Sequence, residues 1–319
     1  MNHLFQAPWW CKNRHIQTLW NTIFKPKTDL GGFERFRMEL DDNDFIDLDI
    51  YKNQDRPTLL LLHGLEGSIE SPYILRMISM AKKRNWQIIV MHFRGCSGET
   101  NRLLRSYNSG VSEDLHEVVE KLLLKNINID YLVGFSLGGN VTLKWLGELA
   151  DKAPIKAAVA ISVPLLLDVC ATEIGKGFSK IYEYHLLRTL RNKTHEKLKH
   201  YGDDILPNKK MIDSLSSFWR FDHYVTAPIH GYSGAADYYE KASSKQFIKS
   251  IAKPTLIIQA KDDPFMNESV LPSSNELSTW VTLEASENGG HVGFVHGKWP
   301  WKAEHYLVQR VPEFLEKHK

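Results

Sequence analysis

The chain has 319 residues, of which 43% are hydrophobic and 24% charged, with a formal net charge of +2 at neutral pH. These values are ordinary for one large globular domain and give no electrostatic reason to expect nucleic-acid binding. Three widely spaced cysteines form neither a disulfide framework nor a metal-ligand pattern, so we expect a cytoplasmic protein without metal or cofactor. We also expect no signal peptide and no transmembrane segment, because no apolar run is long enough for either.

Short apolar runs alternate along the chain with segments of helical spacing, which is typical of an α/β fold with a mostly parallel sheet. The expected strands cover residues 33–40, 45–51, 58–62, 87–92, 129–133, 155–162, 255–259 and 279–283. The expected helices cover residues 71–84, 111–125, 139–150 and 301–318. The first two strands should form an antiparallel pair around the turn at residues 41–44.

Residues 164–251 interrupt this alternation. The segment is long, rich in aromatic and charged residues, and mostly helical in pattern, as at residues 182–191. We interpret it as a helical cap inserted after a sheet strand, with a return helix near residues 243–251. The chain as a whole, residues 1–319, is then a single domain with one insertion.

The most informative motif is Gly134-Phe135-Ser136-Leu137-Gly138, which lies between an expected strand and an expected helix. A serine on such a sharp turn has a strained backbone that exposes its hydroxyl, and only small neighbours fit the turn. The free N–H groups at the start of the helix also favour negative charge beside the serine. The pattern predicts that Ser136 is the nucleophile of a serine hydrolase.

A serine nucleophile needs a base and an orienting acid, which follow it along the chain in sheet hydrolases. The acid candidates, Asp262 and Asp263, come directly after the strand at residues 255–259. We favour Asp263, because the proline that follows fixes a turn able to present its carboxylate, and Asp262 stays the alternative. The base candidate is His291, in a glycine-rich loop after the last strand; His296 lacks that setting.

Two backbone N–H groups are expected to stabilise the oxyanion. We assign one to Leu137, directly after the nucleophile, and one to Leu65 in the His63-Gly64-Leu65 segment. Arg94, after the next strand, more often braces neighbouring loops than binds substrate, and Cys96 receives no role. The aromatic and basic stretch at residues 9–15 suits either a membrane surface or packing on the domain, and we expect packing.

These motifs together resemble the YheT-like branch of the α/β-hydrolases, which is related to the eukaryotic α/β-hydrolase-domain lipases. The matching segments are residues 8–10, 15–19, 63–68, 92–98, 101–102, 134–140, 262–265 and 289–294. The resemblance implies an α/β-hydrolase fold, an esterase-like activity, and Ser136, Asp263 and His291 as the triad.

The leading hypothesis is a serine hydrolase that cleaves carboxylic esters of short- to medium-chain or lipid-like acyl groups. An acyltransferase or thioesterase would use the same triad, and a non-catalytic ligand-binding module would keep only the fold. The expected partner is a small-molecule ester, with peripheral membrane contact left open. The aromatic residues of the cap fit an apolar acyl group and the core of the cap equally well: Phe178, Tyr182, Tyr184, Phe218, Trp219 and Phe221.

Overall fold

The computed structural model describes residues 4–202 and 206–319, and within these ranges eight strands form one sheet in the order β1-β2-β4-β3-β5-β6-β7-β8. Strand β2 runs against both of its neighbours, whereas β4, β3, β5, β6, β7 and β8 are mutually parallel. The strand bounds are β1 Phe33–Glu39, β2 Phe45–Tyr51, β3 Thr58–Leu62, β4 Gln87–Met91, β5 Tyr131–Phe135, β6 Ala157–Ile161, β7 Thr255–Ala260 and β8 Val281–Ser286. The predicted mostly parallel sheet is confirmed.

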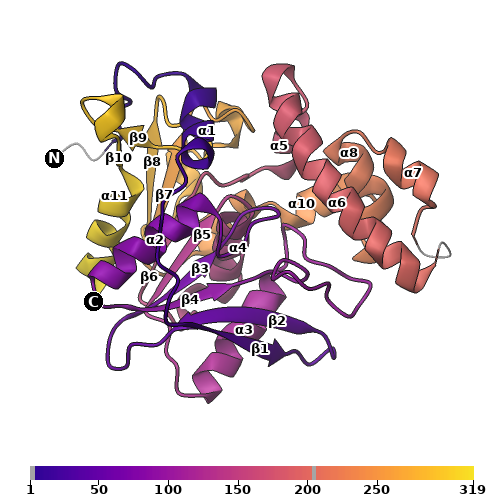
Figure 1. Ribbon diagram of the computed structural model, residues 1–319, viewed down its shortest axis with the longest axis horizontal. Helices are drawn as coiled ribbons and strands as arrows, with labels where there is room; N and C mark the ends of the chain where they lie inside the picture. The colour runs from indigo at the N-terminus through magenta and orange to yellow at the C-terminus, as the bar shows by residue number, and fades with distance from the viewer. Residues whose placement is uncertain (1–3, 203–205) are drawn as a thin grey trace.

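Alternate side chains of the central strands point to opposite faces of the sheet, so each face has its own core. Leu59 and Leu61 of β3 pack with helices α2 (Pro72–Lys83) and α11 (Leu307–Leu315). Leu60 and Leu62 pack with α3 (Ser112–Leu124) and α4 (Leu137–Leu149) on the other face. Helices therefore cover both faces of the sheet (Figure 1), as burial of a parallel sheet requires.

The strand order reverses direction at the centre of the sheet. From β3 the chain moves outward to β4, and it then returns to β5 on the other side of β3. The loops after β3 and β5 consequently lie next to each other at the carboxyl ends of these strands. Such a switch point is where open α/β sheets bind ligands.

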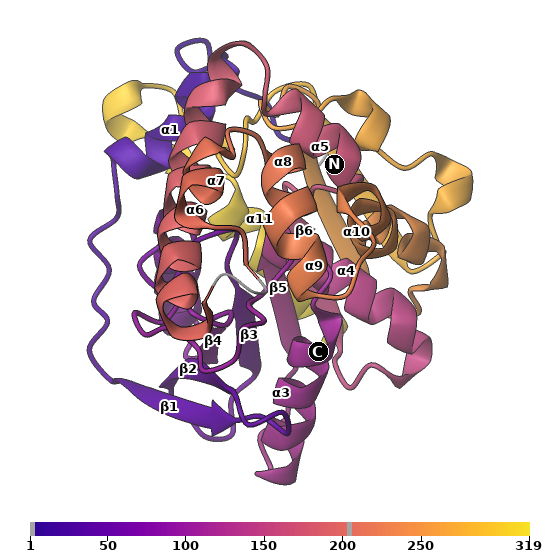
Figure 2. The same ribbon diagram turned by 90° about the vertical axis from the view of Figure 1, so that its right-hand side faces the viewer.

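A helical insertion, the segment between β6 and β7, lies over this edge of the sheet. It contains α5 (Leu167–Glu173), α6 (Lys180–Tyr201), α7 (Lys209–Ser214), α8 (Phe218–Phe221), α9 (Ala227–Ile229) and α10 (Ala235–Ala242). Figure 2 shows α6, α8 and α9 in front of the central strands. The cap bounds of residues 164–251 stay a prediction.

Some elements differ from those predicted. Helix α1 (Arg14–Ile23) and the two-stranded hairpin of β9 (Val295–His296) and β10 (Glu304–His305) were not expected. The final helix begins at Leu307, where its buried residues begin, and residues 243–251 form a 3₁₀ helix over Ser244–Ser250. Helix α4 begins immediately after Ser136, two residues earlier than the apolar periodicity indicated.

Candidate active site

Ser136 occupies the sharp turn between β5 and α4. Its backbone has φ +51° and ψ −118°, a left-handed conformation that a non-glycine residue rarely adopts. A Cβ atom on Gly134 would lie 2.4 Å from the carbonyl oxygen of Gly138, and one on Gly138 would lie 2.5 Å from the carbonyl oxygen of His63. Both glycines are therefore required by close backbone contacts around the serine.

The structure brings Ser136, His291 and Asp263 together from three different loops. The Ser136 Oγ atom lies 3.0 Å from His291 Nε2, and His291 Nδ1 lies 2.8 Å from Asp263 Oδ2. With Nδ1 protonated, His291 donates to Asp263 and accepts the serine hydroxyl proton. The ring of Phe265 stacks on the imidazole at a centroid distance of 4.0 Å, which restricts its orientation.

The two neighbouring aspartates have different partners. The Oδ1 atom of Asp263 accepts the backbone N–H of Phe265, leaving Oδ2 for His291. Asp262 accepts instead from the backbone N–H of Gly290 at 2.9 Å and from the Asn288 amide at 3.2 Å. Burial raises the pKa of Asp262. Asp262 thus holds the loop that carries His291, whereas Asp263 contacts the imidazole itself.

Helix α1 fixes the other side of this histidine loop, a contact that sequence reasoning missed. The Thr18 hydroxyl accepts the backbone N–H of His291 at 2.9 Å and donates to the Arg14 carbonyl. The Gln17 amide bonds both the N–H and the carbonyl of Val295, and the Asn21 amide donates to Val292 at 2.9 Å. The sequence signals for α1 are Asn13, whose side chain caps its N-terminus, and the helical spacing of its apolar residues from Ile16 to Ile23.

The loop after β3 lies directly against the serine. A Cβ atom on Gly64 would lie 3.2 Å from Ser136 Cβ, so the backbone of Gly64 and Leu65 borders the nucleophile candidate. His63 donates from Nδ1 to the Gly64 carbonyl and accepts the Phe93 N–H at Nε2. Complete burial lowers its pKa to about 3, so this histidine is a neutral brace of the loop.

Two lysines of α6 hold the helical insertion to the loops of the sheet. Lys193 pairs at 2.9 Å with the almost fully buried carboxylate of Glu66, which also accepts the Tyr107 hydroxyl. Lys197 donates to the side-chain oxygen of Asn101 at 2.8 Å, and burial lowers its pKa to about 8. Glu66 follows Leu65, so the insertion is tied to the loop beside Ser136.

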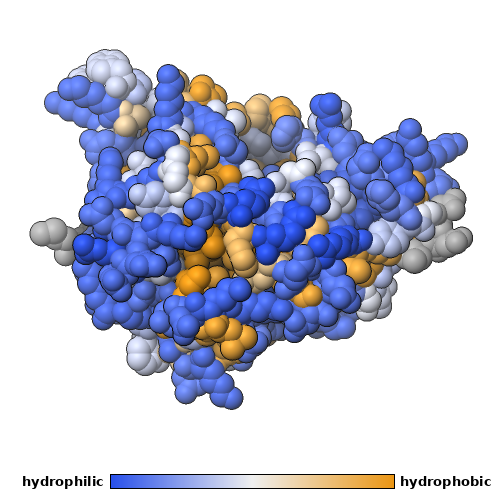
Figure 3. Space-filling model, turned by 60° about the horizontal axis from the view of Figure 1, so that its bottom comes forward, coloured by the Kyte–Doolittle hydropathy of each residue, from blue (hydrophilic) through white to orange (hydrophobic). Residues whose placement is uncertain are grey.

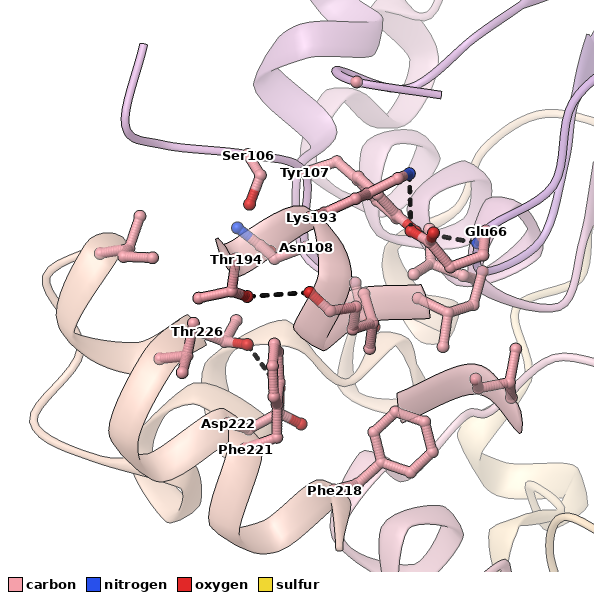
Figure 4. Close-up of a pocket in the computed structure, with 18 of the residues that line it drawn as sticks. Glu66, Ser106, Tyr107, Asn108, Lys193, Thr194, Phe218, Phe221, Asp222 and Thr226 are labelled. Carbon is pink, nitrogen blue, oxygen red and sulfur yellow. Dashed lines mark hydrogen bonds and ion pairs between the residues drawn. The ribbon is translucent and has the colours of Figure 1, made fainter. Parts of the chain in front are cut away.

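A cavity of about 360 Å³ extends from Ser136, Leu65, Leu137 and His291 into the helical insertion. Figure 4 shows Phe218 and Phe221 on one side of it, with Lys193 and Thr194 of α6 across the space. Of the six aromatic residues considered from the sequence, these two phenylalanines line the cavity. Further apolar lining comes from Leu167, Ile174, Leu190, Val225 and Ile229.

The sequence of residues 57–298 matches the family described as the alpha/beta hydrolase fold. The chain belongs to this family. This α/β hydrolase is 40% identical to the Escherichia coli protein named "Putative esterase YheT", across 95% of this chain and 90% of that one. It is 30% identical to mouse Phospholipase ABHD3, across 96% of this chain and 77% of that one. An esterase structure from Pyrococcus furiosus shares the fold, with a TM-score of 0.58, 18% identity, and coverage of 90% and 91%.

The remaining sequence candidates of this α/β hydrolase are structural neighbours of the site. Arg94 is buried and binds Asp114 through two nitrogens, at 2.7 and 2.8 Å, and Asp42 and Asp44 through a third. It therefore braces loops, as expected. Burial raises the pKa of Cys96 to about 11, although Lys193 lies 3.3 Å from its sulfur.

Within the described part of the chain, no group of three or more His, Cys, Asp or Glu side chains is placed to hold a metal ion. A search of the same residues finds no helix with the length and apolar character needed to cross a bilayer.

Proposed function

We propose that this α/β hydrolase cleaves carboxylic esters that carry an apolar acyl group. The observation that carries the proposal is the continuous hydrogen-bonded line from Ser136 through His291 to Asp263, at the mouth of a largely apolar cavity. The esterase and phospholipase names of its relatives point in the same direction. The acyl group would enter the cavity past Phe218 and Phe221.

In the proposed reaction, Ser136 Oγ attacks the ester carbonyl while His291 Nε2 takes its proton. The backbone N–H groups of Leu65 and Leu137 stabilise the tetrahedral oxyanion. The alcohol then leaves with the proton from His291, and Ser136 keeps the acyl group as an ester. Water, deprotonated by His291, attacks this acyl-enzyme, the acid is released, and Ser136 regains its proton. Asp263 keeps the imidazole in the tautomer that both steps need.

Hydrolysis of p-nitrophenyl esters from acetate to palmitate tests the proposal, with Ser136→Ala compared with the exposed control Ser274→Ala. Loss of the nucleophile should reduce kcat by about 10⁶-fold, whereas the control should keep full activity. The preferred chain length measures the acyl space of the cavity. Equal turnover by the wild type and Ser136→Ala would refute the assignment.

The same groups could pass the acyl chain to an alcohol or release it from a thioester. Adding an alcohol and quantifying the new ester against the free acid separates transfer from hydrolysis, and a thioester substrate tests the third reaction. A protein that binds such esters but never labels at Ser136 with a serine-directed phosphonate would support the non-catalytic alternative.

A further inference from the structure

Helix α1 is amphipathic in the inverted sense. Its polar residues Gln17 and Asn21 are 0% and 6% exposed, because they bond the histidine loop. Its apolar residues Ile16 and Ile23 are 47% and 68% exposed, and Phe24 at its end is exposed as well. A helix whose apolar side is exposed can bind another apolar surface, such as that of a partner protein or a membrane, through that side.

A cluster of tryptophans continues this exposed surface. Trp9 and Trp301 are 67% and 75% exposed, and Trp299 lies between them, with ring centroids 6.1 Å from Trp9 and 5.4 Å from Trp301. The neighbouring Trp10 packs on Trp20 of α1, which in turn contacts Phe24. We call these exposed residues the apolar face: Trp9, Ile16, Ile23, Phe24, Trp299 and Trp301.

The segments that carry the apolar face contain more basic than acidic residues, although Lys25 pairs with Glu70 at 2.9 Å and Glu304 is exposed after the tryptophans. No acidic residue precedes Asp29, whereas residues 1–28 contain Lys12, Arg14, Lys25 and Lys27. Lys298 and Lys302 are exposed beside the tryptophans, and Lys298 lies 5.9 Å from the Trp299 ring. Basic side chains around exposed aromatic ones match the headgroups and the boundary of an anionic bilayer.

The start of α6 extends the apolar face. Phe178, just before α6, lies 4.5 Å from His15 between ring centroids, and both Phe178 and Ile181 are exposed. Figures 1 and 2 place α1, the yellow turn between β9 and β10, and the start of α6 along the same upper edge of the molecule. On the side drawn in Figure 3, hydrophilic residues cover most of the surface, and hydrophobic ones show in several small patches.

We propose that the apolar face docks on the surface of a bilayer that contains anionic lipids. The tryptophans and the outer side of α1 insert at the boundary between headgroups and acyl chains, and the lysines contact lipid phosphates. The contact also lies close to the candidate active site. Tyr182 contacts both His15 and Phe265, at centroid distances of 5.9 and 5.1 Å, and Phe265 stacks on His291. Docking therefore places the candidate active site at the lipid surface.

Co-sedimentation of the full chain with vesicles of phosphatidylcholine, with and without phosphatidylglycerol, tests this proposal. The variants are Trp9→Ala/Trp301→Ala and Lys298→Gln/Lys302→Gln. The control is Trp280→Ala, because Trp280 is also exposed but lies just before β8, at the amino ends of the parallel strands and away from their carboxyl ends. The tryptophan variant should bind anionic vesicles about tenfold more weakly than the wild type. Each lysine should contribute about fivefold, and added salt should reduce that contribution.

Hydrolysis of a soluble short-chain ester is measured on the same samples, so loss of docking is distinguished from failure of the proposed function. Wild-type binding that needs phosphatidylglycerol, weakened by both double variants but not by Trp280→Ala, supports the proposal. Absence of wild-type binding, or equal weakening by Trp280→Ala, overturns it. A wild-type dimer that Trp9→Ala/Trp301→Ala converts to a monomer in light scattering also overturns it, since a second copy then covers the apolar face.

Discussion

Thr18→Val should disturb turnover although Thr18 lies 273 residues before His291 in the sequence. Valine keeps the shape of threonine but removes the hydroxyl that accepts the His291 N–H at 2.9 Å. That N–H is then left without an acceptor in the loop that positions the imidazole. An unsatisfied polar group of this kind costs about 1–3 kcal/mol, which corresponds to about 5- to 150-fold in an equilibrium constant.

The assay is steady-state hydrolysis of a short p-nitrophenyl ester over a range of pH. The lost acceptor destabilises the loop conformation that places His291 beside Ser136. We therefore expect kcat to fall by between about fivefold and about 150-fold. The KM value should change little, because Thr18 does not line the cavity. Thr18→Ser restores the hydroxyl and should recover most of the activity.

Thr22→Val is the matched control, since Thr22 is on the same helix but exposed. If Thr18→Val folds with the wild-type Tm and keeps its kcat within about twofold, the reasoning is refuted, because such an effect is below the smallest cost of a lost acceptor. A similar loss in Thr22→Val would attribute the effect to helix propensity instead.

Three further predictions concern stability and reactivity. Gly134→Ala places a methyl group 2.4 Å from the Gly138 carbonyl oxygen. The free energy of unfolding, measured by urea titration, should therefore fall by about 1–3 kcal/mol. His63 titrates near 6.5 when unfolded but at about 3 when folded, so the unfolded chain binds more protons between these values. The free energy of unfolding should therefore fall as the pH drops through this window, and a His63→Gln variant should lose part of that dependence in urea titrations at several pH values. Burial raises the pKa of all three thiols, so a disulfide reagent at mild pH should label them only after denaturation: Cys11, Cys96 and Cys170.

The sheet and the Ser136 turn were predictable because local pattern determines them. Buried strands such as Thr58–Leu62 are almost continuous apolar runs, and Gly134 is required by a clash with Gly138 a few residues away. Gly138 is required by the distant carbonyl of His63, so its place in the turn was predictable from the motif and not from a local clash. The positions of Asp263 and His291 followed from chain order, since the carboxyl ends of parallel strands share one edge. Asp262 and Asp263 are equivalent in spacing, and only the three-dimensional arrangement separates their partners.

Helix α1 could have been predicted, because Ile16, Leu19, Trp20 and Ile23 have the spacing of an amphipathic helix. Its orientation could not, because the same pattern normally indicates that the apolar side is buried. In α1 the buried side is Gln17 and Asn21, whose partners at residues 292–295 are more than 270 positions away. The cavity was equally unpredictable, because Phe218 and Phe221 reach it only through the path of the helical insertion.

The inverted polarity of α1 follows from what it packs against. Within the described residues, only Val295 of the loop at residues 290–295 pairs with a strand, so the other buried backbone groups need different partners. Gln17, Thr18 and Asn21 supply side-chain partners to this loop. Because the side of α1 that faces the histidine loop is polar, Ile16 and Ile23 lie on the exposed side of the helix. The proposed lipid docking would use this exposed apolar side. Thr18 contacts the histidine loop, whereas Trp9 and Trp301 lie outside α1 on the exposed surface, so the effects of changing them should be independent. Thr18→Val should reduce turnover of a soluble ester without weakening vesicle binding, whereas Trp9→Ala/Trp301→Ala should do the reverse. In the combined variant the two losses should add, and strong coupling between them would mean that docking acts on the histidine loop itself.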